Sequence, residues 1–122
     1  MALNTAGSTP YYATRHRYID MLGLNDRHIA KRLVWKTELA WQNVPGHLKG
    51  DGDYVLSRCP DFIIAGPAEG ADISRPWFLS DLEMSRDPRF AQNYQKHQVK
   101  LNPQGERVEQ DGRVFTFYQR IK

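Results

Sequence analysis

One feature constrains the fold of this chain more than any other. It is a short, mainly apolar segment that ends at a glycine and is followed by a group of polar residues. Residues 18–22 can form a strand, Gly23 follows, and residues 25–28 place four polar side chains where a helix can begin. In an α/β sheet, loops and helix N-termini gather at the carboxyl ends of the strands, and ligands bind there. The segment therefore predicts an α/β fold with a binding site at this turn.

Length and composition fit one soluble globular domain. The chain has 122 residues, of which 40% are apolar and 25% charged, values typical of a single globular domain. The single cysteine, Cys59, excludes an intrachain disulfide and is expected to be a buried thiol, because free cysteine is among the most buried residue types. No apolar run approaches the ~20 residues that span a bilayer.

Charge points only weakly to an anionic partner. The net charge is +3 and the pI about 9.1, but the basic residues are scattered among acidic ones and form no run. A nucleic-acid-binding protein usually shows a basic stripe or a recognisable module. We therefore predict no nucleic-acid partner.

Strand and helix patterns alternate along the first half of the chain, and strands dominate the end. Apolar runs predict strands at 1–4, 18–22, 61–65, 98–101, 107–109 and 114–118, and helices at 10–14, 27–33, 53–58, from 80 onward and at 87–94. Irregular chain is expected after residue 33 and a loop at 45–52. The pair Asp111-Gly112 is a strong signal for a hairpin turn. We predict a small single α/β domain over residues 1–122, with a short mixed sheet, flanking helices and a C-terminal β-hairpin.

Helix caps and strand faces can also be predicted. Asp51 or Gly52 is expected to cap the helix at 53–58, and Ser80 with Glu83 has the spacing of a capping box. In the last strand, the two phenylalanines of Phe115-Thr-Phe-Tyr118 share one face, and Thr116 and Tyr118 share the other. Most aromatic residues are expected in the core, but flat rings beside Asp, Asn and His also form sugar-binding surfaces.

Several kinds of catalytic or metal chemistry find little support. Side chains that could ligate a metal occur in the first half of the chain: Asp26, His28, His47, Asp51 and Asp53. No two histidines have the close spacing of a helical zinc pair, so we predict no metal and expect these acids to cap helices and turns. There is no Gly-x-Ser-x-Gly elbow, and the glycines at 46–52 lack P-loop spacing. No cofactor is predicted.

A set of short motifs, in order along nearly the whole chain, points to a family. They are Asn4-Thr-Ala-Gly7, Pro10-Tyr-Tyr12, Ile19-Asp-Met-Leu-Gly-Leu-Asn-Asp-Arg-His-Ile-Ala30, Pro45-Gly-His47, Gly52-Asp-Tyr-Val-Leu56, Pro60-Asp-Phe-Ile-Ile64, Phe78-Leu-Ser-Asp81, Asp87-Pro-Arg-Phe90, Tyr94 and Phe115-Thr-Phe-Tyr118. With these motifs the chain resembles the C-terminal extracytoplasmic domain of bacterial polytopic membrane glycosyltransferases of the arabinofuranosyltransferase-like type.

The resemblance implies a parent enzyme that uses a polyprenyl-phosphate sugar donor. Its catalytic acid would lie on a loop between early membrane helices, so this segment would be a soluble, non-catalytic domain excised from the C-terminus and placed at the periplasmic face. Its partners would be the transmembrane region of the parent and a glycan acceptor. The positions that match the motifs and that we expect to contact ligand are Asp20, Asn25, Asp26, His28 and His47.

Three alternatives stay open. Asp20 and Asp26 can instead tie a turn together, because Asp side chains commonly bond backbone amides in turns. The chain can also be a free-standing ligand-binding or interaction module with a pocket at residues 23–28. Finally, Asp20, Asp26 and His28 can serve as acid and base groups of a small enzyme of unknown reaction.

Overall fold

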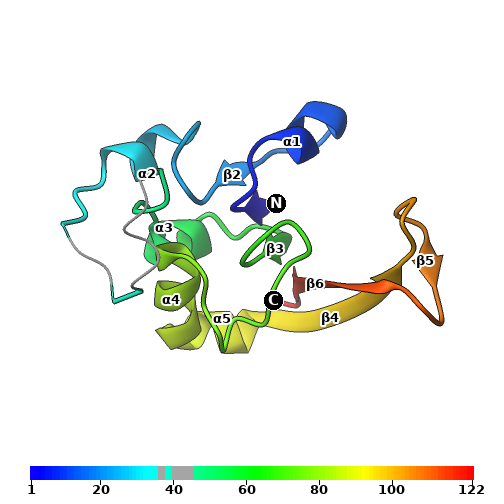
Figure 1. Cartoon of the computed structure of the whole chain (residues 1–122). Helices are drawn as coiled ribbons and strands as arrows, with labels where there is room; N and C mark the ends of the chain where they lie inside the picture. Colours follow the sequence, from blue (N-terminus) through cyan, green and yellow to red (C-terminus); the bar gives the residue numbers. More distant parts are fainter. Residues whose placement is uncertain (36–37, 40–45) are drawn as a thin grey trace.

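One mixed sheet organises the chain in the computed structural model, which describes residues 1–35, 38–39 and 46–122 (Figure 1). The strands are β1 (Ala2–Leu3), β2 (Ile19–Asp20), β3 (Phe62–Ile64), β4 (Tyr94–Leu101), β5 (Arg107–Val108) and β6 (Arg113–Arg120), in the order β2-β1-β3-β6-β4-β5. β2, β1 and β3 are parallel neighbours, whereas β6 pairs antiparallel with β3 and β4. The predicted α/β class with a short mixed sheet is confirmed.

The helices are short and lie where the sequence predicts them, with shifted ends. They are α1 (Ser8–Tyr12), α2 (Arg27–Lys31), α3 (Gly52–Ser57), α4 (Leu79–Arg86) and α5 (Pro88–Asn93). Figure 1 shows α3, α4 and α5 grouped together beside the sheet, and α3 packs against α4. None of the helices in the described part of the chain is long or apolar enough to cross a bilayer. The irregular chain and loop expected beyond residue 33 fall partly on residues 36–37 and 40–45, outside the described residues.

Two helix starts follow from local side-chain chemistry. Asp51 caps α3, as predicted, and its carboxylate accepts a hydrogen bond from the Tyr54 amide at 2.9 Å. Asp87 caps α5 and accepts from the Arg89 amide at 2.9 Å, while Pro88 occupies the first helical position. An N-cap acceptor and a proline at this position both favour helix initiation, since they leave fewer unsatisfied amides.

The predicted capping box of α4 is wrong. The helix starts at Leu79, so Phe78 is the N-cap residue, and the Asp81 carboxylate accepts from the Phe78 amide at 3.1 Å. Ser80 is buried inside the first turn, where its hydroxyl accepts from the Asp51 amide at 2.9 Å. Local spacing favoured Ser80 as the cap, but a contact with a distant loop decides its position.

A long antiparallel strand pair closes the chain. β4 and β6 pair over eight residues each, from Tyr94 opposite Arg120 to Leu101 opposite Arg113. This confirms a C-terminal strand pair, although β5 pairs with β4 and not with β6. β4 begins four residues before its predicted start at residue 98, because Tyr94 follows α5 without a loop.

The core lies between the helices and one face of the sheet. Ala2, Ile63 and Tyr118 are cross-strand neighbours on this face and pack with buried side chains of the helices, among them Val55 and Met84. Thr116 is also buried, so it shares the inner face with Tyr118, as the predicted alternation of the strand places them. The fold therefore has two layers here, sheet and helices.

The opposite face of the sheet is aromatic and only half-buried. Phe117 lies at its centre, with ring centroids 6.1 Å from Phe62 and 5.2 Å from His97. Phe115 and Phe117 point to this face, as the alternation of the strand predicts. Met1, Phe62 and Ile64 join them around a cavity of about 210 Å³.

The environment of the cysteine differs from the prediction. Cys59 is exposed, not buried, and it has a φ of +47°. It lies in the turn between α3 and β3, where the next residue, Pro60, is buried instead. The helix ends at Ser57, and the turn that follows brings the thiol to the surface.

Candidate ligand site at the ends of the parallel strands

The carboxyl ends of the three parallel strands meet at one edge of the sheet. Asp20 is the last residue of β2, Asn4 follows β1, and Ala65 and Gly66 follow β3. β2 and β3 lie on opposite sides of β1, so the strand order reverses there. Open α/β sheets bind ligands at such a reversal.

A cavity of about 220 Å³ opens at this edge, beside β2. It is lined by Ala6, Pro10, Tyr18, Asp20, Asn25 and Asp26. Three of the five residues predicted as ligand contacts therefore share one cavity. The loops before α1 and before α2 form its two sides, because Ala6 belongs to the first and Asp26 to the second.

Asp20 holds the turn that follows β2. Asp20 is 5% exposed, and its carboxylate accepts from the Leu22 amide at 3.0 Å and from the Asn25 amide at 2.6 Å. Gly23 allows the turn to close, since it has a φ of +73° and a Cβ there would lie 2.8 Å from the Ala30 nitrogen. The turn-tying role that the sequence left open is therefore present in the structure.

Asp26 caps α2. One carboxylate oxygen accepts from the His28 and Ile29 amides at 2.9 and 3.1 Å, and the other accepts from the Tyr54 hydroxyl at 3.3 Å. Burial, followed by the charge of Asp26, raises the pKa of Tyr54. The side chain thus fixes the start of α2 against α3 while it borders the cavity.

Asn25 and Tyr18 give the cavity its other recognition groups. The Asn25 side-chain amide is exposed and has no hydrogen bond to a described residue. Tyr18 is half-buried, and its hydroxyl donates to the Ala13 carbonyl at 2.8 Å. The cavity therefore offers a ring held by one hydrogen bond, two fixed carboxylates and one amide with no partner among the described residues.

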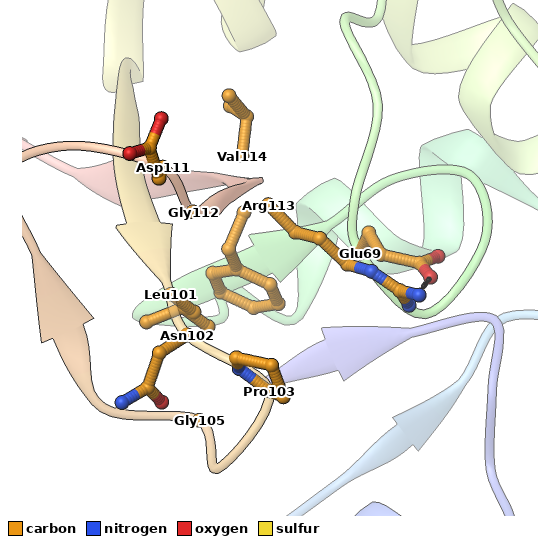
Figure 2. A pocket seen from close by; sticks show the side chains of 10 residues that line it. Glu69, Leu101, Asn102, Pro103, Gly105, Asp111, Gly112, Arg113 and Val114 are labelled. Atoms are coloured by element: carbon orange, nitrogen blue, oxygen red, sulfur yellow. Dashed lines mark ion pairs between the residues drawn. The ribbon is translucent and has the colours of Figure 1, made fainter.

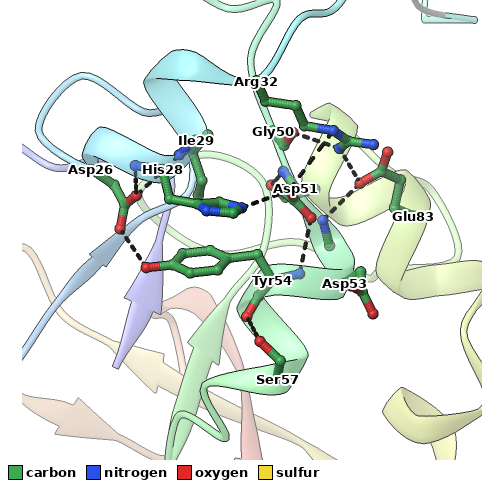
Figure 3. A network of polar contacts seen from close by, with 12 residues as sticks. Asp26, His28, Ile29, Arg32, Gly50, Asp51, Asp53, Tyr54, Ser57 and Glu83 are labelled. Atoms are coloured by element: carbon green, nitrogen blue, oxygen red, sulfur yellow. Dashed lines mark hydrogen bonds and ion pairs between the residues drawn. The ribbon is translucent and has the colours of Figure 1, made fainter.

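The two predicted histidines lie outside this cavity. The His28 ring stacks on Tyr54, with ring centroids 4.0 Å apart, and its Nε2 is 3.2 Å from an Asp51 carboxylate oxygen (Figure 3). The ring nitrogen thus contacts Asp51, whereas the acid–base reading paired His28 with Asp20 and Asp26. The His47 ring stacks near Phe78 at a centroid distance of 5.9 Å.

A polar network beside His28 ties three helices together (Figure 3). The Arg32 guanidinium donates to Glu83 at 2.8 Å and to the Gly50 carbonyl at 2.7 Å, and lies 3.8 Å from Asp51. Glu83 also accepts from the Gly52 amide at 2.7 Å. The hydrogen bond that Arg32 donates to Glu83 is the main cause that raises the pKa of Arg32. These contacts make α2, α3 and α4 one unit.

A buried Asn–Asp pair at the same strand ends was not predicted. The Asn4 side chain donates to Asp81 at 3.1 Å and to the Gly66 carbonyl at 3.2 Å, and Asp81 also accepts from the Gly66 and Phe78 amides at 3.0 and 3.1 Å. Burial nevertheless raises the pKa of Asp81 to about 6. In the sequence, Asn4 is only the polar last residue of the strand predicted at 1–4, a feature too common to identify a contact 77 positions away.

A larger cavity, of about 440 Å³, lies at the far end of the sheet (Figure 2). Residues around the turns of β4, β5 and β6 line it, and an Arg113–Glu69 pair 3.9 Å apart borders it. It contains none of the predicted ligand contacts. Across the described ranges, no three His, Cys, Asp or Glu side chains gather as a metal site.

Comparison with known proteins places the chain in a family without assigning an activity. No curated protein matches it, and no solved structure matches it. Residues 1–118 match a family described as a domain of unknown function, DUF8728. Because this match covers nearly the whole chain, the protein belongs to the DUF8728 family.

Proposed function

We propose that this chain is a non-catalytic, extracytoplasmic domain of a membrane glycosyltransferase that uses a polyprenyl-phosphate sugar donor. In this proposal the domain helps to bind or position the glycan acceptor. The motif resemblance supports the choice of parent enzyme. The observation that carries the binding role is the cavity at the end of β2, which contains Asp20, Asn25 and Asp26.

The groups around the cavity suit a sugar. A pyranose or furanose ring has an apolar C–H face, which packs on an aromatic ring such as Tyr18, and hydroxyls, which donate to carboxylates. The Asn25 amide can both donate and accept. At about 220 Å³ the cavity is smaller than the ~300–1,000 Å³ pockets of drug-sized ligands, so one sugar unit of a longer glycan is the expected occupant.

The bonding of the two acids favours binding over catalysis. Each carboxylate oxygen of Asp20 and Asp26 accepts a hydrogen bond from a backbone amide or from the Tyr54 hydroxyl. These bonds orient the carboxylates as fixed acceptors. A domain that positions an acceptor needs this rigidity, while the transfer chemistry would belong to the membrane part of the parent.

Asn25→Ala is the sharpest test of the glycan site. It removes the unpartnered side chain and keeps the backbone amide that bonds Asp20. Saturation-transfer NMR with soluble arabino-, galacto- and manno-oligosaccharides should show weak binding that Asn25→Ala reduces about fivefold or more, since a lost hydrogen bond to a ligand contributes about 1 kcal/mol. Gln95→Ala, an exposed amide on β4, is the matched control. Equal loss in both variants, or no loss in either, contradicts the site.

The membrane part of the proposal has a separate test. The reading frame ahead of Met1 should encode apolar segments of ~20 residues, long enough to span a bilayer. A native transcript that starts at Met1 with no such segment fused to it contradicts the parent enzyme. It would leave a free-standing ligand-binding module that uses the same cavity.

A further inference from the structure

The net positive charge of this protein resides in its first 35 residues. Residues 1–35 contain five Lys and Arg against two acids, whereas residues 46–122 contain eleven of each and residues 36–45 one of each. The two acids of the first segment are Asp20 and Asp26, whose carboxylates are engaged by amides and by Tyr54. This N-terminal edge, defined as residues 1–35, is therefore strongly basic toward solvent.

Most basic side chains of the N-terminal edge have no acidic partner. Arg15, Arg17, Arg27 and Lys31 are exposed, and none of them forms an ion pair with a described residue. Arg32 is the exception, because it binds Glu83. In the rest of the described chain, ion pairs engage five basic residues: Arg86, Arg89, Lys96, Arg113 and Arg120.

The same edge carries the most exposed large apolar side chains. Between 66% and 91% of their surface is accessible, and they are Tyr11, Tyr12, Leu24, Leu33 and Trp35. The other exposed side chains of this kind in the described residues reach only 46–54%. Exposed apolar groups that cluster together commonly mark an interaction surface.

The fold places the elements that carry these side chains along one edge of the molecule. β2 is the edge strand of the sheet, and Figure 1 shows α1, β2 and α2 along the upper edge of the protein. The starts of α1 and α2 are close together, because Pro10 and Asp26 line the same cavity. Aromatic, aliphatic and cationic side chains are thus exposed on segments that lie along one edge of the molecule.

We infer that the N-terminal edge docks on the anionic headgroup surface of a lipid bilayer. Trp and Tyr favour the depth of the headgroups, Arg and Lys are attracted to anionic lipids, and aliphatic side chains reach the acyl boundary. A single-stranded nucleic acid would also match the charge and the rings. It offers no apolar phase for Leu24 and Leu33, which are 66% and 77% exposed, so the lipid surface fits better.

This docking goes beyond the proposed glycan site and uses other residues. The glycan cavity needs the side chain of Asn25, while docking needs exposed cations and apolar side chains around it. Each can fail without the other. If the parent enzyme is membrane-bound as proposed, docking would present the cavity close to the lipid surface.

Vesicle co-sedimentation of the full chain tests the inference. Mixed phosphatidylcholine–phosphatidylglycerol vesicles should bind the protein at least about tenfold more tightly than phosphatidylcholine vesicles, and added salt should weaken binding. Replacing Arg15, Arg17, Arg27 and Lys31 together by Gln should lower affinity for the mixed vesicles by about a hundredfold. Leu33→Ser with Trp35→Ser should also lower it.

Matched controls separate this surface from net charge and from the glycan site. Gln replacement of four exposed basic residues elsewhere, Arg58, Arg75, Arg107 and Lys122, makes the same change in charge and should leave most vesicle binding intact. Asn25→Ala should also leave it intact, and circular dichroism should show all variants folded. Equal losses in the two charge variants, equal binding to both vesicle types, or tighter binding to single-stranded DNA than to the mixed vesicles would overturn the inference.

Discussion

The N-terminal edge and the remainder of the described chain differ in structure and in charge. The edge contains two-residue strands and five-residue helices, four unpaired cations and the most exposed apolar side chains. Residues 46–122 contain the eight-residue strands β4 and β6, the eight-residue helix α4 and balanced charge. The long elements can be stabilised by the pairing and packing between them, whereas the short ones depend on caps and turns. We conclude that residues 46–122 provide the framework and that the edge presents the binding surfaces.

Substitutions in the two regions should differ most in their effect on stability. Ile63 is fully buried at the centre of the sheet, so Ile63→Ala should lower the free energy of unfolding by about 2–5 kcal/mol through lost burial and a cavity. Leu33, which is 77% exposed, should tolerate Leu33→Ala within about 0.5 kcal/mol. Urea unfolding followed by circular dichroism measures both. Similar losses for the two variants would break the proposed division of roles.

The buried contact between Asn4 of the edge and Asp81 of the framework should make the free energy of unfolding depend on pH. The pKa of Asp81 is raised to about 6 in the folded protein, above its value of about 4 in an unfolded chain. The folded state then binds the proton more tightly, so the contribution of Asp81 is largest below pH 4 and is lost as pH rises to about 6. The loss amounts to about 2–3 kcal/mol.

Asp81→Asn cannot titrate and is the matched variant. The difference in unfolding free energy between wild type and Asp81→Asn should therefore change between pH 4 and pH 7, with the wild type losing stability relative to the variant. Acids with a lowered pKa, such as Asp72 at about 2, have the opposite sign: they stabilise the fold above about pH 4 and lose that contribution as pH falls toward 2. A constant difference across this range would show that Asp81 is already charged throughout.

Removing the cap of α2 should lower the free energy of unfolding less than a core substitution does, but more than the removal of a surface charge does. Asp26→Ala removes the acceptor for the His28 and Ile29 amides and should lower the unfolding free energy by about 1 kcal/mol. Asp26→Ser keeps an N-cap acceptor and should recover most of that loss. Thermal unfolding measures both variants. Equal melting temperatures for wild type and Asp26→Ala would show that the edge does not depend on this cap.

Substitutions of surface charges should give the smallest difference in stability between the two regions. Lys96 lies 2.8 Å from Asp72, and both side chains are 43% exposed, so Lys96→Met should lower stability by less than about 1 kcal/mol. Lys31→Met in the edge removes a cation with no acidic partner among the described residues and should change stability by about zero. The paired variant alone should also lose its sensitivity to salt. A larger effect at Lys31 would mean that its charge supports the fold.

Features set by neighbouring residues could be predicted, and those set by distant contacts could not. The Asp51 cap and the position of Pro88 follow from the local sequence, as does the burial of Ile63 within a short apolar run. The position of Ser80 depends on the Asp51 amide, 29 positions away. The polar first residues of β4 show no strand pattern in the sequence. They form a strand because they pair with β6.

In the candidate site, too, the features set by neighbouring residues could be predicted and those set by distant contacts could not. Asp20, Asn25 and Asp26 share a cavity because a single turn around Gly23 brings them together. His28 lies one residue into α2, and its ring stacks on Tyr54 and contacts Asp51 instead of facing the cavity. No local pattern could reveal the Asn4–Asp81 pair or the Arg32–Glu83 bridge, whose partners are 77 and 51 positions apart.

A map of backbone amide shifts during titration with the soluble oligosaccharides tests the central claim most directly. We predict that the shifts concentrate on the cavity at the end of β2, around Ala6, Tyr18 and residues 20–26. Shifts that concentrate on the larger cavity at the far end of the sheet, or no shifts at millimolar oligosaccharide, would contradict it.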